Sequence, residues 1–539
     1  MRRHRETRIL LAWAVLATVL ITAPVAVLLQ QSILIDDTFY ALSVARHLAS
    51  GEGSTVDGVH RTNGYQPLWV WILSILTVAG GLSPDGTVRA ALIACALITL
   101  LCGVRLGGLV RLLGGSRNAS FMAIVLWLAN PYFLRRQLNG LETVLAAWLL
   151  IEAVRASLRC EIGARKSAGG GNGSRSWGAP LAGELRAGLL AGLAALARID
   201  LIIVAPGLAL RRRWVAAAAA ILVPAPWLVW CWLQFGHPVP LSGAATRTLF
   251  GILNDLPDQT LLLWESSNVS LTFASLFGLA WPAQALQRAG LPGALSWIVV
   301  PAALAVLFGI LLSGRGARER IAAGWGAGRP LAWWIVGLAL YDAVAYGLLY
   351  PAPWHLSRYL LPLHALGVAW IALLYDKTVI PADGEKDAAR RWIERHRSRL
   401  WWCLWATAMV AATVPYWVDM TGGQPPSLQL EVARWLREDV RSSWRVGMVQ
   451  SGVVAYYAER PVINLDGKVN PQALRALRER RMGAYLEEEK IDLFGDWNDL
   501  VERCVFGRAR PFLRQNVRLL EAGVEAPPPP FAFYRTMDE

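Results

Sequence analysis

Residues 9–29 read ILLAWAVLATVLITAPVAVLL, an apolar run that follows the basic start MRRHRETR. A hydrophobic segment of about 20 residues can cross the hydrocarbon core of a bilayer as a helix. The run is longer than the apolar part of a secretory signal, and Ala-Pro-Val-Ala-Val at 23–27 is a poor cleavage site. We therefore expect a retained first span whose basic start stays in the cytoplasm.

The composition of the whole chain favours a membrane protein. Of its 539 residues, 55% are hydrophobic and only 17% are charged, whereas a soluble protein carries about 25% charged residues. Many of the 26 tryptophans stand at the ends of apolar runs, as they do in interfacial aromatic belts. The net charge of +14 comes largely from short loops between these runs. We therefore expect membrane lipids, and no nucleic acid, as partners.

Clusters of basic residues set the expected orientation, because positive charge on short loops marks the cytoplasmic side. The clusters lie at 105–117, 155–175, 211–213, 315–320 and 377–397. The outer stretches are then 31–66, 135–142, 234–260, 350–358 and the tail after Tyr416. The apolar runs predict an α-helical polytopic protein with about 11 to 13 transmembrane helices.

Three apolar runs do not fit a simple span. Residues 67–83 are short and predict a tilted juxtamembrane helix or a re-entrant segment. Residues 187–210 have basic residues beyond both ends and predict a helical hairpin that turns near Arg198. Residues 266–286 are ambiguous as a span.

From about Gln424 the long apolar runs stop. We predict strands at 445–449 and 461–465, a helix at 451–459 and a charged helix at 471–490. This alternation is typical of a small α/β domain. We therefore divide the chain into a polytopic domain at 1–420, with its first outer loop at 31–66, and an extracytoplasmic α/β domain at 421–539.

Two adjacent carboxylates, Asp36 and Asp37, follow the first span directly. Such a pair at a membrane boundary must be solvated, paired or functional. By position alone, a solvated loop cap is the commoner role. The next residues, 40–49, place apolar side chains on one helical face and Arg46 with His47 on the other, which predicts an amphipathic helix at the interface.

Other ionisable residues interrupt or border apolar runs, and in the expected topology all of them lie on the outer side. They are Glu142, Arg198, Asp200, Arg247, His355 and Arg358. Because charges inside apolar segments are costly, such residues are candidates for function. The structural alternative is an intramembrane ion pair, such as Arg198 with Asp200. The convergence of all six on one side favours a functional site.

The first outer loop also carries a longer pattern. It reads Asp36-Asp37-x-Phe39-Tyr40, Ala45-Arg46-His47, Gly51-x-Gly53, Asp57-Gly58 and Thr62-Asn63-Gly64-Tyr65-x-Pro67-Leu68-Trp69. This pattern resembles the first outer loop of bacterial GT-C superfamily glycosyltransferases, in particular their uncharacterised polytopic members. Later blocks match the same family at 139–143, 196–200, 358–362, 451–456 and 464–467. The resemblance covers most of the chain.

The resemblance implies a GT-C-like fold and a polyprenyl-phosphate-linked sugar donor that is consumed on the outer face of the bacterial plasma (inner) membrane. The acceptor would be an envelope glycan, lipid or protein. The family's acidic pair carries over to Asp36 and Asp37, and its second acidic position to Glu142. One departure is Gln66, which stands where the family has a histidine, so that imidazole is not available as a ligand or proton donor.

The residues permit an inverting displacement. Asp36 or Asp37 would take the acceptor proton as general base. The leaving group is a lipid phosphate, for which Arg358 is the first candidate and Arg198 or Arg247 the second. We place His355, Asn63 and Tyr65 with them as substrate-binding residues. A divalent metal held by Asp36, Asp37 or Glu142 is compatible with this chemistry, but the ligand spacing gives it no support.

Two other functions compete with glycosyl transfer. A transporter or flippase of lipid-linked glycan intermediates also places Arg and Asp along a path through the membrane. The acidic pair in a long structured loop and the absence of internal repeats argue against it. A non-catalytic scaffold would tolerate replacement of the acidic residues. The α/β tail fits acceptor recognition and an inert cap equally well.

Overall fold

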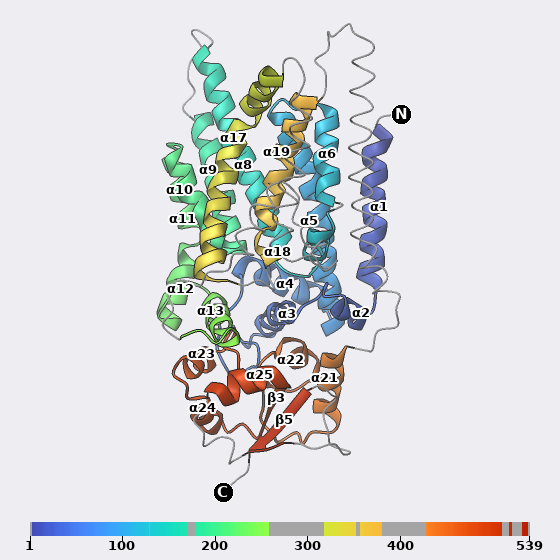
Figure 1. Ribbon diagram of the computed structural model, residues 1–539, viewed down its shortest axis with the longest axis vertical. Coiled ribbons are helices and arrows are strands. Elements are labelled where there is room, and N and C mark those ends of the chain that lie inside the picture. Colours follow the sequence, from blue (N-terminus) through green and yellow to red (C-terminus); the bar gives the residue numbers. More distant parts are fainter. Residues whose placement is uncertain are drawn as a thin grey trace.

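The computed structural model describes residues 3–128, 130–169, 178–257, 317–351, 356–379, 427–508, 517–519 and 531–536. Figure 1 shows these parts in layers along the longest axis: an upright helical bundle, a layer of helices lying across its base, and a small α/β domain beneath. The start of α1 lies at the far end of the bundle from the α/β domain.

The bundle contains most of the long helices. They are α1 (Arg3–Thr22), α5 (Pro84–Leu112), α6 (Arg117–Leu128), α8 (Thr143–Gly169), α9 (Gly178–Ala197), α10 (Val204–Leu210), α11 (Trp214–Leu222), α12 (Ala225–Phe235), α17 (Ala317–Val344) and α19 (Leu361–Val379). Leucine, valine and tryptophan side chains are exposed on the outer surface of several of them, for example Leu97 on α5 and Trp333 on α17. Such a surface suits contact with lipid.

Three stretches of the described chain are long and apolar enough to cross a membrane: Pro84–Leu112, Trp214–Phe235 and Trp325–Leu349. Five shorter apolar helices accompany them. The expected total of about 11 to 13 spans stays a prediction, because 258–316, with the ambiguous run 266–286, and 380–426 lie outside the described residues. The expected single span at 9–29 is interrupted: α1 ends at Thr22, and α2 (Val25–Gln30) begins after Pro24, which cannot donate a helical hydrogen bond.

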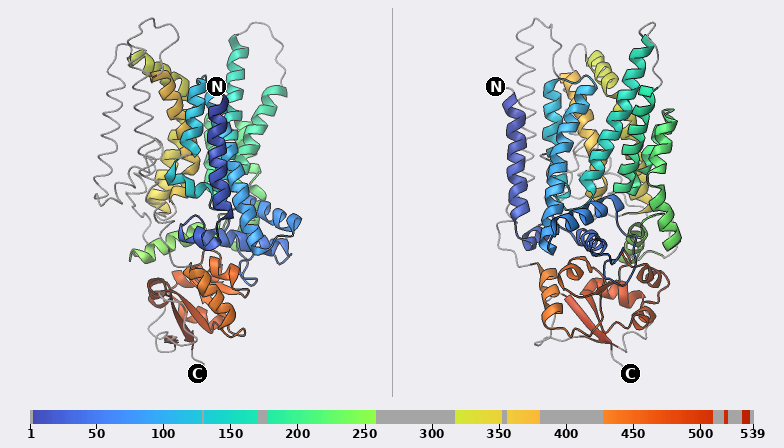
Figure 2. Two further views of the ribbon diagram at one scale, coloured as in Figure 1. Left: turned by 90° about the vertical axis from the view of Figure 1, so that its right-hand side faces the viewer. Right: turned by 180° about the vertical axis from the view of Figure 1, so that it is seen from behind.

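The layer at the base of the bundle contains α3 (Asp36–Ala49), α4 (Pro67–Gly80) and α13 (Leu241–Leu253). The short helix α7 (Pro131–Gln137) packs against α5, α8 and α18 (Leu356–Tyr359). Both views in Figure 2 show the blue N-terminal segments of this layer between the bundle and the α/β domain. The amphipathic helix begins at Asp36, earlier than expected, because carboxylates in the first turn interact favourably with the helix dipole. α4 has 14 residues, or about 21 Å, and is too short to cross a core of about 30 Å.

The hairpin predicted at 187–210 was expected to turn near Arg198, and the structure interrupts the helix at this residue. α9 ends at Ala197, and the 3-10 turn η1 (Ile199–Ile203) precedes α10. Arg198 has extended backbone angles, φ −152° and ψ 115°. The break turns its guanidinium away from the helix axis and toward the base of the bundle, where the other charged groups lie.

The C-terminal α/β domain contains a five-stranded sheet of order β2-β1-β3-β5-β4. Its elements are α21 (Leu428–Glu438), β1 (Val446–Met448), α22 (Gly452–Tyr457), β2 (Val462–Asn464), α23 (Pro471–Arg478), α24 (Met482–Glu488), β3 (Leu493–Trp497), α25 (Asn498–Leu500), β4 (Val517–Leu519) and β5 (Phe531–Thr536). β1 is parallel to β2 and β3, whereas β5 is antiparallel to β3 and β4. The two predicted strands and the helix between them are confirmed.

The single helix predicted at 471–490 is wrong. The chain forms α23 and α24, and Arg480 between them has a left-handed backbone with φ 54°. The N–H of Arg481 donates to the carbonyl of Ala476 at 2.9 Å and closes α23. The second helix can then turn and bury Tyr485 and Leu486 in the domain core.

The α/β domain packs closely on the first outer loop. The hydroxyl of Tyr40 accepts hydrogen bonds from the N–H of Ser451 at 3.1 Å and from the amide of Asn464 at 3.0 Å. A Cβ on Gly64 would lie 2.0 Å from the carbonyl oxygen of Lys468, and one on Gly452 would lie 2.3 Å from that of Asp36. Only glycine permits either approach, so the two glycines set the distance between loop and domain.

A buried histidine also joins the loop to the domain. Nδ1 of His60 lies 2.7 Å from Asp57, and Nε2 lies 3.2 Å from Glu489 of α24's C-terminal turn. Burial lowers the pKa of His60, but the two carboxylates outweigh it and raise that pKa above its ordinary value of 6.5. Arg445 in turn pairs with Glu489 at 2.9 Å.

We expect this contact to make docking of the domain pH-dependent. A raised folded pKa means that the stabilisation is complete below about pH 6.5 and declines as the pH rises through the folded value. Thermal unfolding in detergent should therefore show a falling Tm between pH 6 and pH 8 for the wild type, and a flatter profile for His60→Gln. Parallel profiles for the two proteins would contradict this role for His60.

Candidate active site

A cavity of about 300 Å³ lies where the bundle, the base layer and the α/β domain meet. Asp37 of α3, Glu142 before α8 and Arg198 after α9 line it, together with Arg358 of α18 (Leu356–Tyr359) and Lys468 after β2. The structure thus brings together five of the charged residues proposed from sequence, the fifth being Asp200. It adds a lysine from the C-terminal domain.

Asp37 lies between two cations. Its Oδ2 accepts a hydrogen bond from Arg358 at 3.0 Å, and its Oδ1 accepts one from the Lys468 ammonium at 3.1 Å. Lys468 is buried, which lowers its pKa, but Asp37, Asp466 and Asp36 together raise that pKa above the ordinary value. Lys468 is therefore positively charged at neutral pH.

Arg198 anchors the other side of the cavity. It donates to both oxygens of Asp200, at 3.2 and 2.6 Å, and lies 3.5 Å from Glu142. The hydroxyl of Tyr346 donates to Asp200 as well. Arg358 lies 3.7 Å from the same oxygen of Glu142. Glu142 therefore bridges the two arginines.

These contacts form one charge network in which cations and carboxylates alternate. In order, its members are Lys468, Asp37, Arg358, Glu142, Arg198 and Asp200. Burying a charge is costly unless it is paired and hydrogen-bonded. Because the signs alternate, each of the six side chains lies next to at least one opposite charge in a mostly buried site.

Asp36 points away from this cavity. Its Oδ1 accepts a hydrogen bond from the N–H of Val453 at 2.9 Å, at the start of α22. Burial raises the pKa of Asp36, while Val453 and Lys468 act in the opposite direction. Neighbouring residues on a helix are turned by about 100° from each other. The acidic pair is therefore divided: Asp37 faces the cavity, and Asp36 holds the α/β domain.

The remaining candidates take other positions. Arg247 donates to the backbone carbonyl of Leu349 and does not line the cavity. Asn63 fixes backbone groups at 239 and 241. Tyr65 lines the cavity and shares a hydrogen bond with Ser54 at 2.9 Å. Gln66 also lines it and accepts from the N–H at 199. His355 lies outside the described residues.

Lys468 and Tyr346, whose ring stacks on that of Tyr359, were missed by sequence reasoning. The two rings lie 4.4 Å apart and nearly parallel, and Arg198 lies 4.7 Å above Tyr359. The signal for Lys468 was its position directly after Asn464-Leu-Asp466-Gly467, a block already noted as matching the family. A strand followed by Asp-Gly predicts a turn, but this pattern does not predict which residue the next side chain will contact.

The donor set does not fit a bound divalent metal. Among the described residues, no group of three His, Cys, Asp or Glu side chains is placed to hold one. Of the three proposed ligands, Asp36 faces the α/β domain, whereas Asp37 and Glu142 already form ion pairs with arginine side chains.

Comparisons with solved structures agree on the fold. ArnT from Cupriavidus metallidurans, bound to undecaprenyl phosphate, is 12% identical with a TM-score of 0.53 over 97% of this chain and 98% of ArnT. The Archaeoglobus fulgidus oligosaccharyltransferase, tethered with an acceptor peptide containing the NVT sequon, is 12% identical with a TM-score of 0.51 over 93% and 72%. Both are GT-C superfamily membrane glycosyltransferases.

At this identity the likeness establishes the fold: the chain is an α-helical membrane protein of the GT-C fold with a small C-terminal α/β region. Residues 420–522 match a family described as a domain of unknown function (DUF8728). A sequence search among curated proteins finds no match.

We expect loss of the buried Arg198 to destabilise the protein. Arg198→Met leaves Glu142 and Asp200 buried with one cationic partner fewer, at a cost of about 3 kcal/mol. The midpoint of unfolding in an SDS titration should therefore move to a lower SDS concentration. The control is Arg186→Met. This arginine is 62% exposed and lies as far as 4.0 Å from the carboxylate of Glu152, so its loss should lower the free energy of unfolding by less than about 1 kcal/mol. Equal shifts for the two variants would contradict the structural role of the network.

Proposed function

We propose that this GT-C-fold protein is a glycosyltransferase that moves a sugar from a polyprenyl-phosphate-linked donor to a cell-envelope acceptor. The observation that supports this most strongly is the cavity at the base of the bundle, where one carboxylate, Asp37, lies between two cations. An anion-binding pair beside a carboxylate suits a reaction that expels a phosphate and removes a proton.

The proposed orientation places this cavity on the extracytoplasmic face of the plasma membrane. The basic start of α1 would lie in the cytoplasm, and the α/β domain, with its boundary near 420/421, would lie outside. The start of α1 and the α/β domain are at opposite ends of the molecule (Figure 1), which supports this arrangement. A lipid-linked donor would then enter from the bilayer beside the bundle.

Arg358 and Lys468 would bind the donor phosphate. Both point at the same carboxylate, 3.0 and 3.1 Å from its two oxygens, so a phosphate can take the place of Asp37 between them. Charge-assisted hydrogen bonds to phosphate are strong, and the guanidinium fork of Arg358 can make two in parallel. Glu142 would keep Arg358 oriented during this exchange, because it lies 3.7 Å from the arginine.

Displacement by the phosphate frees Asp37 to act as general base. The acceptor hydroxyl oxygen forms a bond to the anomeric carbon from the side opposite the phosphate, and its proton passes to Asp37. The bond between the anomeric carbon and the phosphate oxygen breaks, and its electron pair leaves with the polyprenyl phosphate held by Arg358 and Lys468. The configuration of the sugar is inverted. Similar structures have been solved with undecaprenyl phosphate and with an acceptor peptide bound, and these ligands suit both halves of the reaction.

We expect Asp37→Asn to abolish most transfer. The amide is isosteric but cannot accept the proton, so kcat should fall by about 10²–10⁴-fold. Transfer would be measured in nanodiscs with a panel of radiolabelled polyprenyl-phosphate sugars and envelope extract as acceptor. The matched control is the neighbouring Asp36→Asn, which should retain most of kcat because Asp36 faces the α/β domain. Equal losses in both variants would refute the assignment of the base, and transfer by Asp37→Asn at the wild-type rate would refute the mechanism.

Replacement of Lys468 should weaken binding of the donor more than binding of the acceptor. Lys468→Met removes one charge-assisted hydrogen bond, so the KM for the donor should rise about 10-fold or more, whereas the KM for the acceptor should change little. Lys468→Arg keeps the charge and should recover most of the donor affinity. Limited proteolysis would verify that the α/β domain stays docked in both variants. An unchanged donor KM in Lys468→Met would remove Lys468 from the proposed phosphate site.

A further inference from the structure

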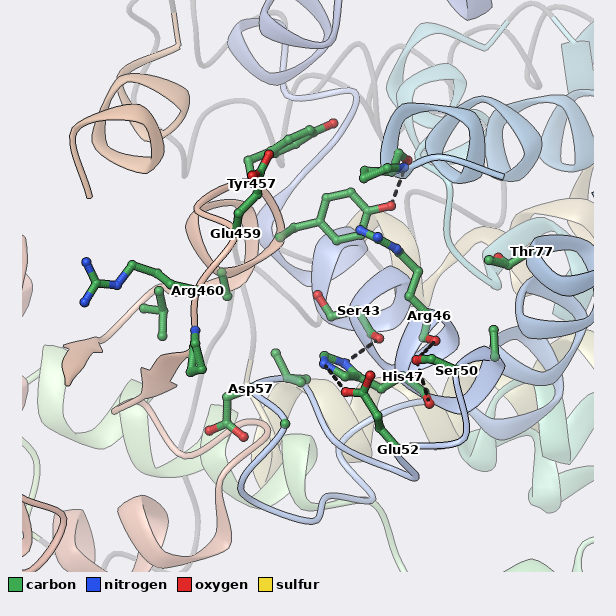
Figure 3. Close-up of a pocket in the computed structure, with 18 of the residues that line it drawn as sticks. Ser43, Arg46, His47, Ser50, Glu52, Asp57, Thr77, Tyr457, Glu459 and Arg460 are labelled. Carbon is green, nitrogen blue, oxygen red and sulfur yellow. Dashed lines mark hydrogen bonds and ion pairs between the residues drawn. The ribbon is translucent and has the colours of Figure 1, made fainter. Parts of the chain in front are cut away.

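A second and larger cleft, of about 820 Å³, lies beside the active site. Its walls come from the C-terminal half of α3, the loop at 52–58, the end of α4 and the segment 455–462 of the α/β domain. Figure 3 shows polar and charged side chains from these segments pointing into it, among them Ser43, Arg46, Ser50 and Glu52. The volume is typical of sites for ligands of several rings, and far exceeds that of one phosphate.

One rim of the cleft is apolar and exposed. Val78 at the end of α4 lines the cleft and is 62% exposed. Ile75, one turn earlier on the same helix, is 66% exposed. α4 is too short to span the membrane and lies in the layer at the base of the bundle (Figure 1). A ligand in the cleft would therefore have its polar part against the α/β domain and an apolar part along α4.

Most charged groups of the cleft are already paired. Arg460 donates to backbone carbonyls at 436 and 440, Arg437 pairs with Glu459, and His47 lies 3.4 Å from Glu52. Arg46 differs: its guanidinium stacks over the ring of Tyr456 at 5.3 Å, and no carboxylate of the described residues pairs with it. The lining therefore offers many hydrogen-bond donors and acceptors with little net charge. This suits a hydroxyl-rich, nearly neutral headgroup.

We propose that this cleft binds the headgroup of a glycolipid, with its acyl chains along α4 and its sugar hydroxyls on Arg46 and the polar groups of α3. Arg46 follows Asp37 by nine residues on α3, or about two and a half helical turns, so the two side chains leave opposite faces of the helix. The cleft and the charged cavity share no lining residue, and the glycolipid site is therefore separate from the proposed reaction.

Binding can be tested without turnover by photo-crosslinking in phosphatidylcholine nanodiscs. The probe is a diglucosyl diacylglycerol with a diazirine on its headgroup. We expect adducts on peptides that contain 43–58 or 455–462. Arg46→Gln, and Ser50→Trp at an exposed position in the cleft, should each reduce the yield at least fivefold. Arg475→Gln, an exposed arginine of α23 away from the cleft, should stay within twofold of wild type.

Other outcomes would overturn the glycolipid site. Equal labelling of wild type and both cleft variants would remove it, and so would equal labelling by phosphatidylglycerol that carries the same diazirine, because a phospholipid site would then fit better. If free maltose at the same concentration as the glycolipid probe reduced crosslinking, the acyl chains would not contribute to binding, and the proposed contact along α4 would be refuted.

Discussion

The carboxylate of Asp37 accepts hydrogen bonds from Arg358 and Lys468, which lie 321 and 431 residues farther along the chain. Each of these charges is largely removed from solvent, and a charge in such a position is costly unless it is paired. The pairing continues through Glu142 to Arg198 and Asp200, so that helices from distant parts of the bundle are joined at its base. The same groups that stabilise the ligand-free site would hold a phosphate when one enters.

The α/β domain is part of this site, because its Lys468 completes the network. Its position depends on very close backbone contacts at Gly64 and Gly452, where a methyl group would collide with the facing carbonyl. Tyr40 and Asp36 add hydrogen bonds to backbone N–H groups of the domain. The tail is thus more than a cap over the bundle. Its docking determines whether the second cation reaches Asp37.

Helix α3 connects the two cavities. Its N-terminal turn presents Asp37 to the charged site, and its C-terminal half presents Arg46 to the larger cleft. A rigid helix fixes the separation and direction of the two sites, which a flexible loop could not do. The arrangement gives a physical reason for an acidic first turn and a basic last turn on one amphipathic helix: both charges suit the helix dipole, and each lines a different cavity.

The sequence by itself determined the membrane character, the α/β structure of the C-terminal part, the helix end at Arg198 and most of the charged residues of the candidate site. These follow from local properties, since apolar length, strand alternation and the cost of a charge in an apolar run are visible in short segments. Only the tertiary structure decided that Asp37 and not Asp36 faces the cavity, that Arg247 lies away from it, that 471–490 forms two helices and that Lys468 completes the network. Those outcomes depend on helix rotation, on one left-handed residue and on contacts between segments hundreds of residues apart, which no local pattern encodes.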